Sequence, residues 1–183
     1  MTSATASVRA IGALSAGLLA LGTLAACTPE PKPTPTKTAL FSSDEDAFKA
    51  AEETYRAYTD ALNDVDTGDP KTFEPVMYWA SGQASTALKK SLSELHAENV
   101  SLVGDTEIVT VTGIATDTNA GTVSLHICAD VSNTDVIDSK GASLIPEGRA
   151  PVQSLLVDFN AADTSTGLRV ISTTGDESRT CSQ

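Results

Sequence analysis

The side chains of this sequence whose types and spacing best suit chemistry are His126, Cys128 and Asp130, which alternate with apolar residues. Successive side chains of a β-strand point to opposite faces of the sheet, so these three would share one face. A histidine beside a carboxylate of raised pKa could act as general acid and base in proton transfer. The odd-numbered residues 123–129 are apolar and would meet any covering helices, which places His126 and Asp130 outward. Acid–base catalysis on this strand is therefore the alternative to a non-catalytic role.

Cys27 is predicted to be a site of lipid attachment. Residues 24–27 read Leu-Ala-Ala-Cys and match the lipobox, in which a cysteine after small residues takes up a diacylglyceryl group. An apolar run over about residues 10–23 precedes them and is shorter than the roughly 20 residues of a transmembrane helix. We expect residues 1–26 to be a signal peptide that is removed. The alternative is an ordinary signal peptide cleaved at an Ala-x-Ala-like site, with an incidental cysteine.

Residues 27–39 predict a tether that begins at the lipidated cysteine. Proline alternates with polar residues over residues 28–36, which excludes a helix and favours an extended polyproline conformation. Acyl chains contribute about 0.8 kcal/mol for each buried methylene, so they would hold the protein on the extracytoplasmic face of a bacterial cell membrane. A proline-rich recognition ligand is the alternative interpretation of this segment.

With Cys27 lipidated, Cys128 and Cys181 remain as an even pair in an oxidising compartment. We predict a disulfide between them that holds the C-terminal segment against a strand and stabilises the fold by about 4 kcal/mol. Two unpaired thiols are the alternative. We expect no metal site, because we find no histidine or further cysteine at ligand spacing from either residue.

Composition limits the class of protein. Removing residues 1–26 from the 183-residue chain leaves 157, which suits one domain over residues 40–183. Loss of Arg9 changes the formal net charge from −12 to −13, which argues against nucleic acid and anionic lipid as partners. The sequence has no phosphate-binding glycine loop, Gly-x-Ser-x-Gly elbow or zinc-binding helix signature, which disfavours hydrolases and nucleotide enzymes. We expect no cofactor. We interpret Asp117-x-Asn119-x-Gly121 as a hairpin turn and not as a calcium loop.

Three helices are predicted before residue 100. A capping box at Ser42 and Glu45 opens the first helix, whose apolar residues recur at three- and four-residue spacing as far as Val65. Residues 66–69 end it, and Asp69 caps a short second helix that continues to about residue 78. Residues 81–96 form the third helix, with Leu88 and Leu92 on its apolar face.

After residue 99 the period changes to alternation, which predicts strands. We expect strands at residues 107–116, 122–131, 135–138, 149–160 and 168–173, most of them joined by hairpins. Helices followed by a run of antiparallel strands indicate an α+β fold, with three N-terminal helices packed on a curved antiparallel sheet.

This order resembles the cone-shaped fold of the nuclear-transport-factor-2-like (SnoaL-like) superfamily, and in particular its small actinobacterial lipoproteins. The stretches that carry the resemblance are residues 41–47, 50–58 and 128–132, and it spans about residues 40–175. Members of that superfamily include enzymes, such as dehydratases and isomerases with His and Asp in the concave cavity, and binding or structural domains. The resemblance implies a fold, and a homodimer through the outer sheet face stays open, but it assigns no function.

Four further residues have a structural interpretation beside a functional one. Tyr55 and Tyr58 could stack on a ligand, but we expect them in the core. Trp79 is the sole tryptophan and is expected to anchor the helices, although it could gate a pocket. His96 lies near a helix C-terminus, where a histidine interacts favourably with the helix dipole.

Three functions remain open from the sequence. The preferred one is a non-catalytic, lipid-anchored domain that binds an envelope protein or a small molecule. The second is a cone-fold enzyme that uses His126 and Asp130 for proton transfer on a small molecule. The third is a transporter's substrate-capture lipoprotein, which the length disfavours, because two-lobed capture proteins are about twice as long.

Overall fold

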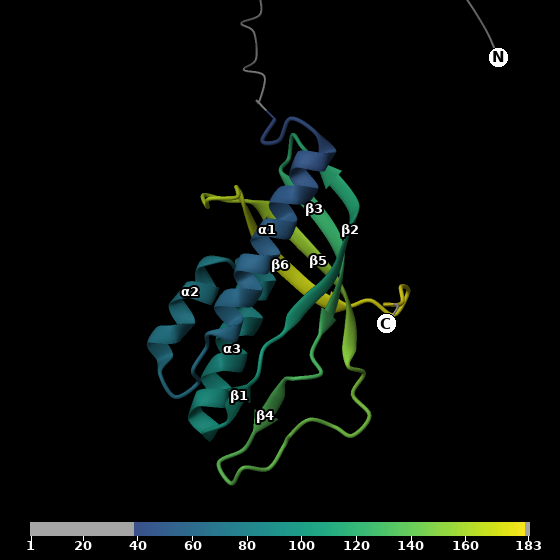
Figure 1. Ribbon diagram of the computed structural model, residues 1–183. Helices are drawn as coiled ribbons and strands as arrows, with labels where there is room; N and C mark the ends of the chain where they lie inside the picture. Colours follow the sequence, from purple (N-terminus) through teal and green to yellow (C-terminus); the bar gives the residue numbers. More distant parts are fainter. Residues whose placement is uncertain (1–38, 182–183) are drawn as a thin grey trace, which may run out of the picture. The chain divides into compact units, whose positions relative to one another are not determined.

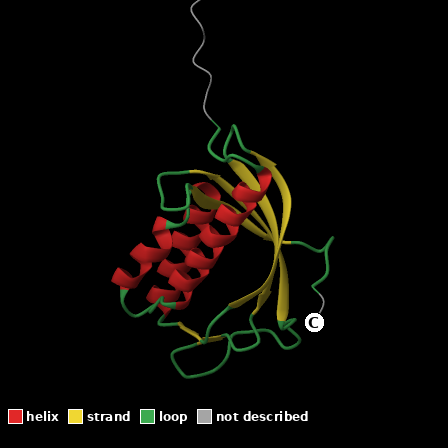
Figure 2. Ribbon diagram, turned by 45° about the horizontal axis from the view of Figure 1, so that its top comes forward, coloured by secondary structure: helices red, strands yellow, loops and turns green. Residues whose placement is uncertain are grey.

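The computed structural model describes residues 39–181, which form helices on one face of a curved antiparallel sheet (Figures 1 and 2). The α+β architecture expected from the sequence is therefore confirmed. The signal peptide, Cys27 and nearly all of the tether lie outside the described residues and stay predictions. Between residues 39 and 181, none of the helices has the length and hydropathy that crossing a membrane requires.

The helices come first along the chain, and side chains cap two of them. Helix α1 covers Asp44–Asn63 and begins at Ser43, whose side chain accepts a hydrogen bond from the Asp46 amide. After it, Asp69 caps the 3-10 turn Pro70–Thr72 (η1), which leads directly into α2 at Phe73–Tyr78. Helix α3 covers Gly82–Glu98 and ends at Asn99, which adopts the left-handed conformation with φ of 55°.

Four strands form the main sheet, in the spatial order β2-β3-β5-β6, and every neighbouring pair is antiparallel. Their bounds are Glu107–Asp117 (β2), Thr122–Asp130 (β3), Val152–Ala161 (β5) and Leu168–Gly175 (β6). Two short strands, Ser101–Val103 (β1) and Asp135–Ile137 (β4), pair with each other in a separate two-stranded sheet. Register shifts interrupt β2 twice, and such bulges bend and twist the strand.

The core lies between the concave face of the sheet and α1. Leu125, Ile127 and Phe159 are 0–1% exposed there. Ala47, Ala51 and Tyr55 meet them from α1 at three- and four-residue spacing, because the helical repeat places these positions on one stripe. A second cluster joins α1, α2 and α3 and contains Val65, Val76, Ala80, Leu88 and Leu92.

Close contact between α1 and β2 requires a residue without a side chain at position 113. A Cβ on Gly113 would lie 2.7 Å from the Phe48 ring, so the ring packs directly on the strand backbone. Phe48 is itself part of the layer that packs against the core. The absence of a side chain at Gly113 therefore fixes how closely the start of α1 approaches the sheet.

Several predicted details were wrong. Ser43, not Ser42, caps α1, and Ser42 instead donates its hydroxyl to the Asp46 carboxylate. The helix ends at Asn63, before Val65, which packs into the second cluster from the following turn. The strand expected at residues 135–138 does not join the main sheet, because it pairs with β1, which the sequence analysis missed.

Candidate functional site

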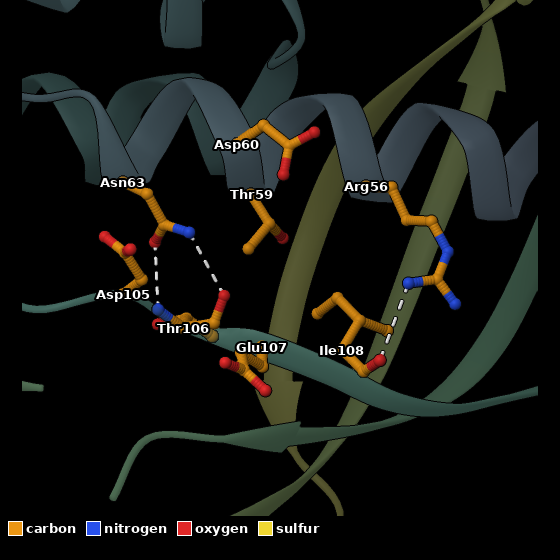
Figure 3. Close-up of a pocket in the computed structure, with 8 residues that line it drawn as sticks. All are labelled: Arg56, Thr59, Asp60, Asn63, Asp105, Thr106, Glu107 and Ile108. Atoms are coloured by element: carbon orange, nitrogen blue, oxygen red, sulfur yellow. Dashed lines mark hydrogen bonds between the residues drawn. The ribbon is translucent and has the colours of Figure 1, made fainter. Parts of the chain in front are cut away.

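An open groove lies between the C-terminal half of α1 and the beginning of β2, with a volume of about 490 Å³ (Figure 3). Helix α1 contributes Arg56, Thr59, Asp60 and Asn63 to its lining. The opposite wall is the extended segment of residues 105–108, which leads into β2. The groove therefore lies between α1 and the segment that leads into β2.

Asn63 closes one end of the groove by joining the helix to the strand segment (Figure 3). Its Nδ2 donates to the Thr106 carbonyl at 3.1 Å, and its Oδ1 accepts from the Thr106 amide at 3.0 Å. This pair satisfies both backbone groups of Thr106 where no strand pairing does so. Asn63 is thus a structural clamp, and the groove is held open at a defined width.

Arg56 stands at the other end and is already engaged. Its Nε and Nη2 donate to Glu52 Oε1 at 3.0 and 2.8 Å, and Nη1 lies 3.5 Å from the Ile108 carbonyl. The remaining charged lining consists of Asp60, Asp105 and Glu107, all exposed. Because Glu52 already neutralises the one cation, the groove presents a negative surface to solvent.

A second hollow of about 200 Å³ continues the groove toward β1 and β4. It shares Asn63, Asp105 and Thr106 with the first and adds the small sheet as its floor. None of the residues lining either hollow is a histidine, cysteine or serine. The two hollows can therefore bind a ligand through charge and hydrogen bonds.

The concave face of the sheet, where the fold could enclose a cavity, is filled by aliphatic and aromatic side chains. Tyr55 is 5% exposed and meets Phe159 edge to face, with ring centroids 6.5 Å apart. Tyr58 lies beside Tyr55, with centroids 5.8 Å apart. Burial raises the pKa of both phenols, so they stay neutral. Tyr55 therefore lies in the core as expected, and Tyr58 is partly buried against it.

His126 lies on the opposite, convex side of the sheet and is 7% exposed. Its Nε2 is 2.9 Å from the Ser154 hydroxyl oxygen on β5. Ser154 in turn donates its hydroxyl to the Arg179 carbonyl at 2.8 Å. The segment after β6 therefore covers the histidine, which does not open into the groove or the core.

Asp130 shares that convex side, as the alternation predicted, but the structure does not bring it to His126. Four residues of β-strand separate them, which is about 13 Å. The Asp130 carboxylate accepts the Ser132 amide at 2.8 Å, and this hydrogen bond holds its pKa below the ordinary value. A general acid needs the opposite shift, so this pair is poorly arranged for acid–base catalysis.

Cys128 and Cys181 form the predicted disulfide, with 5.7 Å between their Cα atoms and a sequence separation of 53 residues. The bond attaches the segment after β6 to β3, on the side of the sheet away from the helices (Figure 1). A ring nitrogen of His126 lies within 4.8 Å of both sulfurs. The statement that no histidine stands at ligand spacing was therefore wrong, because residues i and i+2 of a strand share a face.

Several other polar and aromatic residues have structural partners. His96 Nδ1 lies 2.7 Å from the Thr67 carbonyl, so the histidine joins α3 to the turn after α1. The Trp79 indole packs edge to face on Tyr78, with centroids 5.0 Å apart. Asp117 accepts two amides of the β2–β3 turn, as expected for a hairpin. Asp158 accepts the hydroxyls of two serines from neighbouring strands, at 2.6 and 2.8 Å.

Comparison with known proteins yields likenesses of structure only. No protein-family model matches the chain, and no curated protein matches it in sequence. The intermembrane space region of the chloroplast protein ARC6 is 10% identical, with a TM-score of 0.49, and the match covers 70% of this chain and 95% of that one. Aln2 from a Streptomyces species is 15% identical, with a TM-score of 0.44 and coverage of 72% and 89%. VirB8 of Agrobacterium tumefaciens is 10% identical, with a TM-score of 0.41 and coverage of 75% and 96%.

At these identities and TM-scores no function follows from the likenesses. The class of fold is defined by the elements themselves, three helices on the concave face of a four-stranded antiparallel sheet. This is the architecture that the resemblance to the nuclear-transport-factor-2-like superfamily implied.

Proposed function

We propose that this chain is a lipid-anchored, non-catalytic binding domain on the extracytoplasmic face of a bacterial cell membrane. The observation that carries the proposal is the packing of the concave sheet face, where Tyr55, Leu125 and Phe159 occupy the space that an enclosed active site needs. We assign the ligand to the polar groove between α1 and β2, whose lining contains no histidine, cysteine or serine. Binding is thus better supported than proton-transfer catalysis.

The charge of the groove indicates the kind of ligand. Asp60, Asp105 and Glu107 carry three negative charges, whereas Arg56 is paired with Glu52. An acidic hollow in a chain of net charge −12 attracts cations and repels anions. We therefore propose a basic segment of an envelope protein as the occupant, with its lysine or arginine side chains in the groove.

The location of the domain is supported by two independent features. The Cys128–Cys181 disulfide is of a kind that persists in oxidising compartments outside the cytoplasm. The lipobox ending at Cys27 supplies the attachment to the membrane, and the proline-rich residues after it supply a spacer. On this proposal the groove faces the envelope space and not the cytoplasm.

A charge-neutralising triple variant tests the groove. Asp60→Asn, Asp105→Asn and Glu107→Gln would remove its three carboxylates with little change in side-chain volume. A matched control changes Asp163→Asn, Glu94→Gln and Glu98→Gln, which lie outside the groove and remove the same number of negative charges. Chemical crosslinking in intact cells should give a specific adduct with the wild type and with the control variant, and not with the groove variant.

Two results would contradict the proposal. An adduct that forms equally well with the groove variant would mean that another surface makes the contact. A small-molecule turnover that disappears in His126→Ala, and not in the groove variant, would instead support the cone-fold enzyme.

A further inference from the structure

Three potential metal ligands, His126, Cys128 and Cys181, lie together on the convex side of the sheet. One ligand atom from each falls within 4.8 Å of the other two, the one such group of three found in residues 39–181. His126 and Cys128 are 7% and 5% exposed, and Cys181 is half-buried. In the oxidised protein both sulfurs belong to the disulfide, so neither can serve as a thiolate ligand.

The hydrogen bonds around His126 assign the protons of its ring. The Ser154 hydroxyl donates its only hydrogen to the Arg179 carbonyl, so toward His126 it can only accept. Nε2 must therefore carry a proton and donate it to Ser154. In the neutral ring this leaves the lone pair on Nδ1. A histidine whose second nitrogen is hydrogen-bonded to an oxygen is the usual arrangement of a metal ligand.

From this geometry we propose that reduction of the Cys128–Cys181 disulfide creates a Cys₂His site for one thiophilic transition metal of the Zn²⁺ or Cu⁺ class. A dithiol reductant supplies two electrons and two protons and becomes a disulfide itself. The S–S bond breaks to give two thiols. A divalent metal then displaces both thiol protons and binds two thiolates and a neutral imidazole, so the bound site carries no net charge.

The positions of the three side chains fit this coordination after a small movement. Zinc–sulfur bonds of about 2.3 Å and zinc–nitrogen bonds of about 2.0 Å place tetrahedral ligand atoms about 3.3 to 3.8 Å apart. Cys128 is fixed in β3 between two hydrogen-bonded strands. Cys181 lies in the irregular segment after β6, which can shift once the bond is broken. A fourth position is left for water, which makes the site open.

The site depends on the redox state, which goes beyond the proposed binding function and does not involve the groove. Thiolate and imidazole ligands favour zinc and copper over magnesium and calcium. In the oxidised protein this group of three retains His126 alone as a ligand, so the site should bind these metals poorly. The domain would therefore take up metal only where a dithiol reductant acts on it.

Cobalt and zinc binding by the full chain, purified in detergent, tests the proposal. A Cys27→Ser background leaves only the two relevant cysteines. After reduction and removal of the reductant without air, we expect one Co²⁺ per chain. The bound cobalt should show the thiolate charge-transfer absorption and visible bands of a tetrahedral site, and Zn²⁺ should displace it. The oxidised sample should bind at least about 100-fold more weakly, and Mg²⁺ should not compete.

Variants distinguish a metal site that includes His126 from metal binding by the two thiols alone. His126→Ala should weaken zinc binding by the reduced chain at least about tenfold, and Ser154→Ala should weaken it by a similar factor through the ring orientation. His96→Ala, which changes the only other histidine, should bind zinc as the wild type does. Circular dichroism without metal checks that each reduced chain is folded.

The proposal is overturned if the reduced chain binds no zinc, or if His126→Ala binds it as tightly as the wild type. It is equally overturned if the reduced chain is unfolded and zinc does not restore the fold. Zinc that refolds such a chain, or that raises its melting temperature only when His126 is present, supports the proposal.

Discussion

Removing the disulfide should lower the stability of the domain by an amount that the loop length sets. The bond closes a loop across 53 residues of sequence. In the chain-entropy model such a loop restricts the unfolded chain by about 14 cal/mol/K, which corresponds to about 4 kcal/mol at 25 °C. For a folded unit of roughly 140 residues, an unfolding entropy of about 2.1 cal/mol/K per residue converts this into a Tm about 13 °C lower.

The double variant Cys128→Ala/Cys181→Ala is the perturbation, and the compact unit from Thr36 onward is the sample. Urea unfolding followed by circular dichroism and by the fluorescence of the sole tryptophan gives the free energy of unfolding. Coincidence of the two transitions checks that the unfolding is two-state. Cys27 is absent from this sample and contributes nothing to the comparison.

A loss smaller than about 1 kcal/mol would refute the reasoning. It would mean that the segment around Cys181 separates from β3 without unfolding the sheet. The segment would then not belong to the structure that unfolds cooperatively. A loss above about 6 kcal/mol would also contradict it, because loop entropy would then explain too little of the effect.

Three further predictions concern the interface between α1 and the sheet, the groove and the segment after β6. Gly113→Ala should cost about 1–3 kcal/mol in urea unfolding, because its Cβ would meet the Phe48 ring at 2.7 Å, whereas Gly175→Ala meets nothing within 4 Å and should be near neutral. Asn63→Ala should cost about 1–3 kcal/mol and raise hydrogen exchange at the beginning of β2, since two backbone groups lose their partner. Asp176→Asn should lower Tm at pH 6 and by much less at pH 2. Hydrogen bonds from its neighbours hold the Asp176 pKa at about 2, so the stabilisation is fully present above pH 3.8 and is lost as the pH falls through about 2. A Tm difference that persists unchanged at pH 2 would contradict that assignment.

Periodicity in the sequence predicted the long helices and strands that bury one face against a neighbouring layer. The stripe of Ala51 and Tyr55 on α1 and the alternation along β3 both have a burial pattern that repeats over several turns or residue pairs. Details that depend on one residue were less predictable. Ser42 and Ser43 are equally good capping residues in sequence, and the extended backbone of Ser43 selects it as the cap.

Short and non-local features could not be predicted from the sequence. Strands β1 and β4 have three residues each, so neither has a measurable period, and they pair across more than 30 residues. The groove depends on the contact of Asn63 with Thr106, 43 residues away. No spacing rule links a helix terminus to the loop before a strand, so the site residues there were missed entirely.

The neighbourhood of His126 was predictable and was overlooked. Once Cys128 is placed on a strand and bonded to Cys181, the residue two positions earlier must lie on the same face and within reach of the sulfurs. The strand alternation carried this signal. Helical ligand patterns do not contain this signal, because residues i and i+2 of a helix do not share a face.

Attachment of the domain to the membrane through Cys27 is central to the proposed function. Intact-mass and N-terminal peptide mass spectrometry of the protein from its native membrane tests it directly. We predict a mature chain that begins at Cys27, with residues 1–26 removed and a diacylglyceryl group on the cysteine sulfur. We also predict that Cys27→Ser is lost from the membrane fraction. A mature chain that begins at another residue, carries no lipid and is recovered from the soluble fraction would contradict the proposed function.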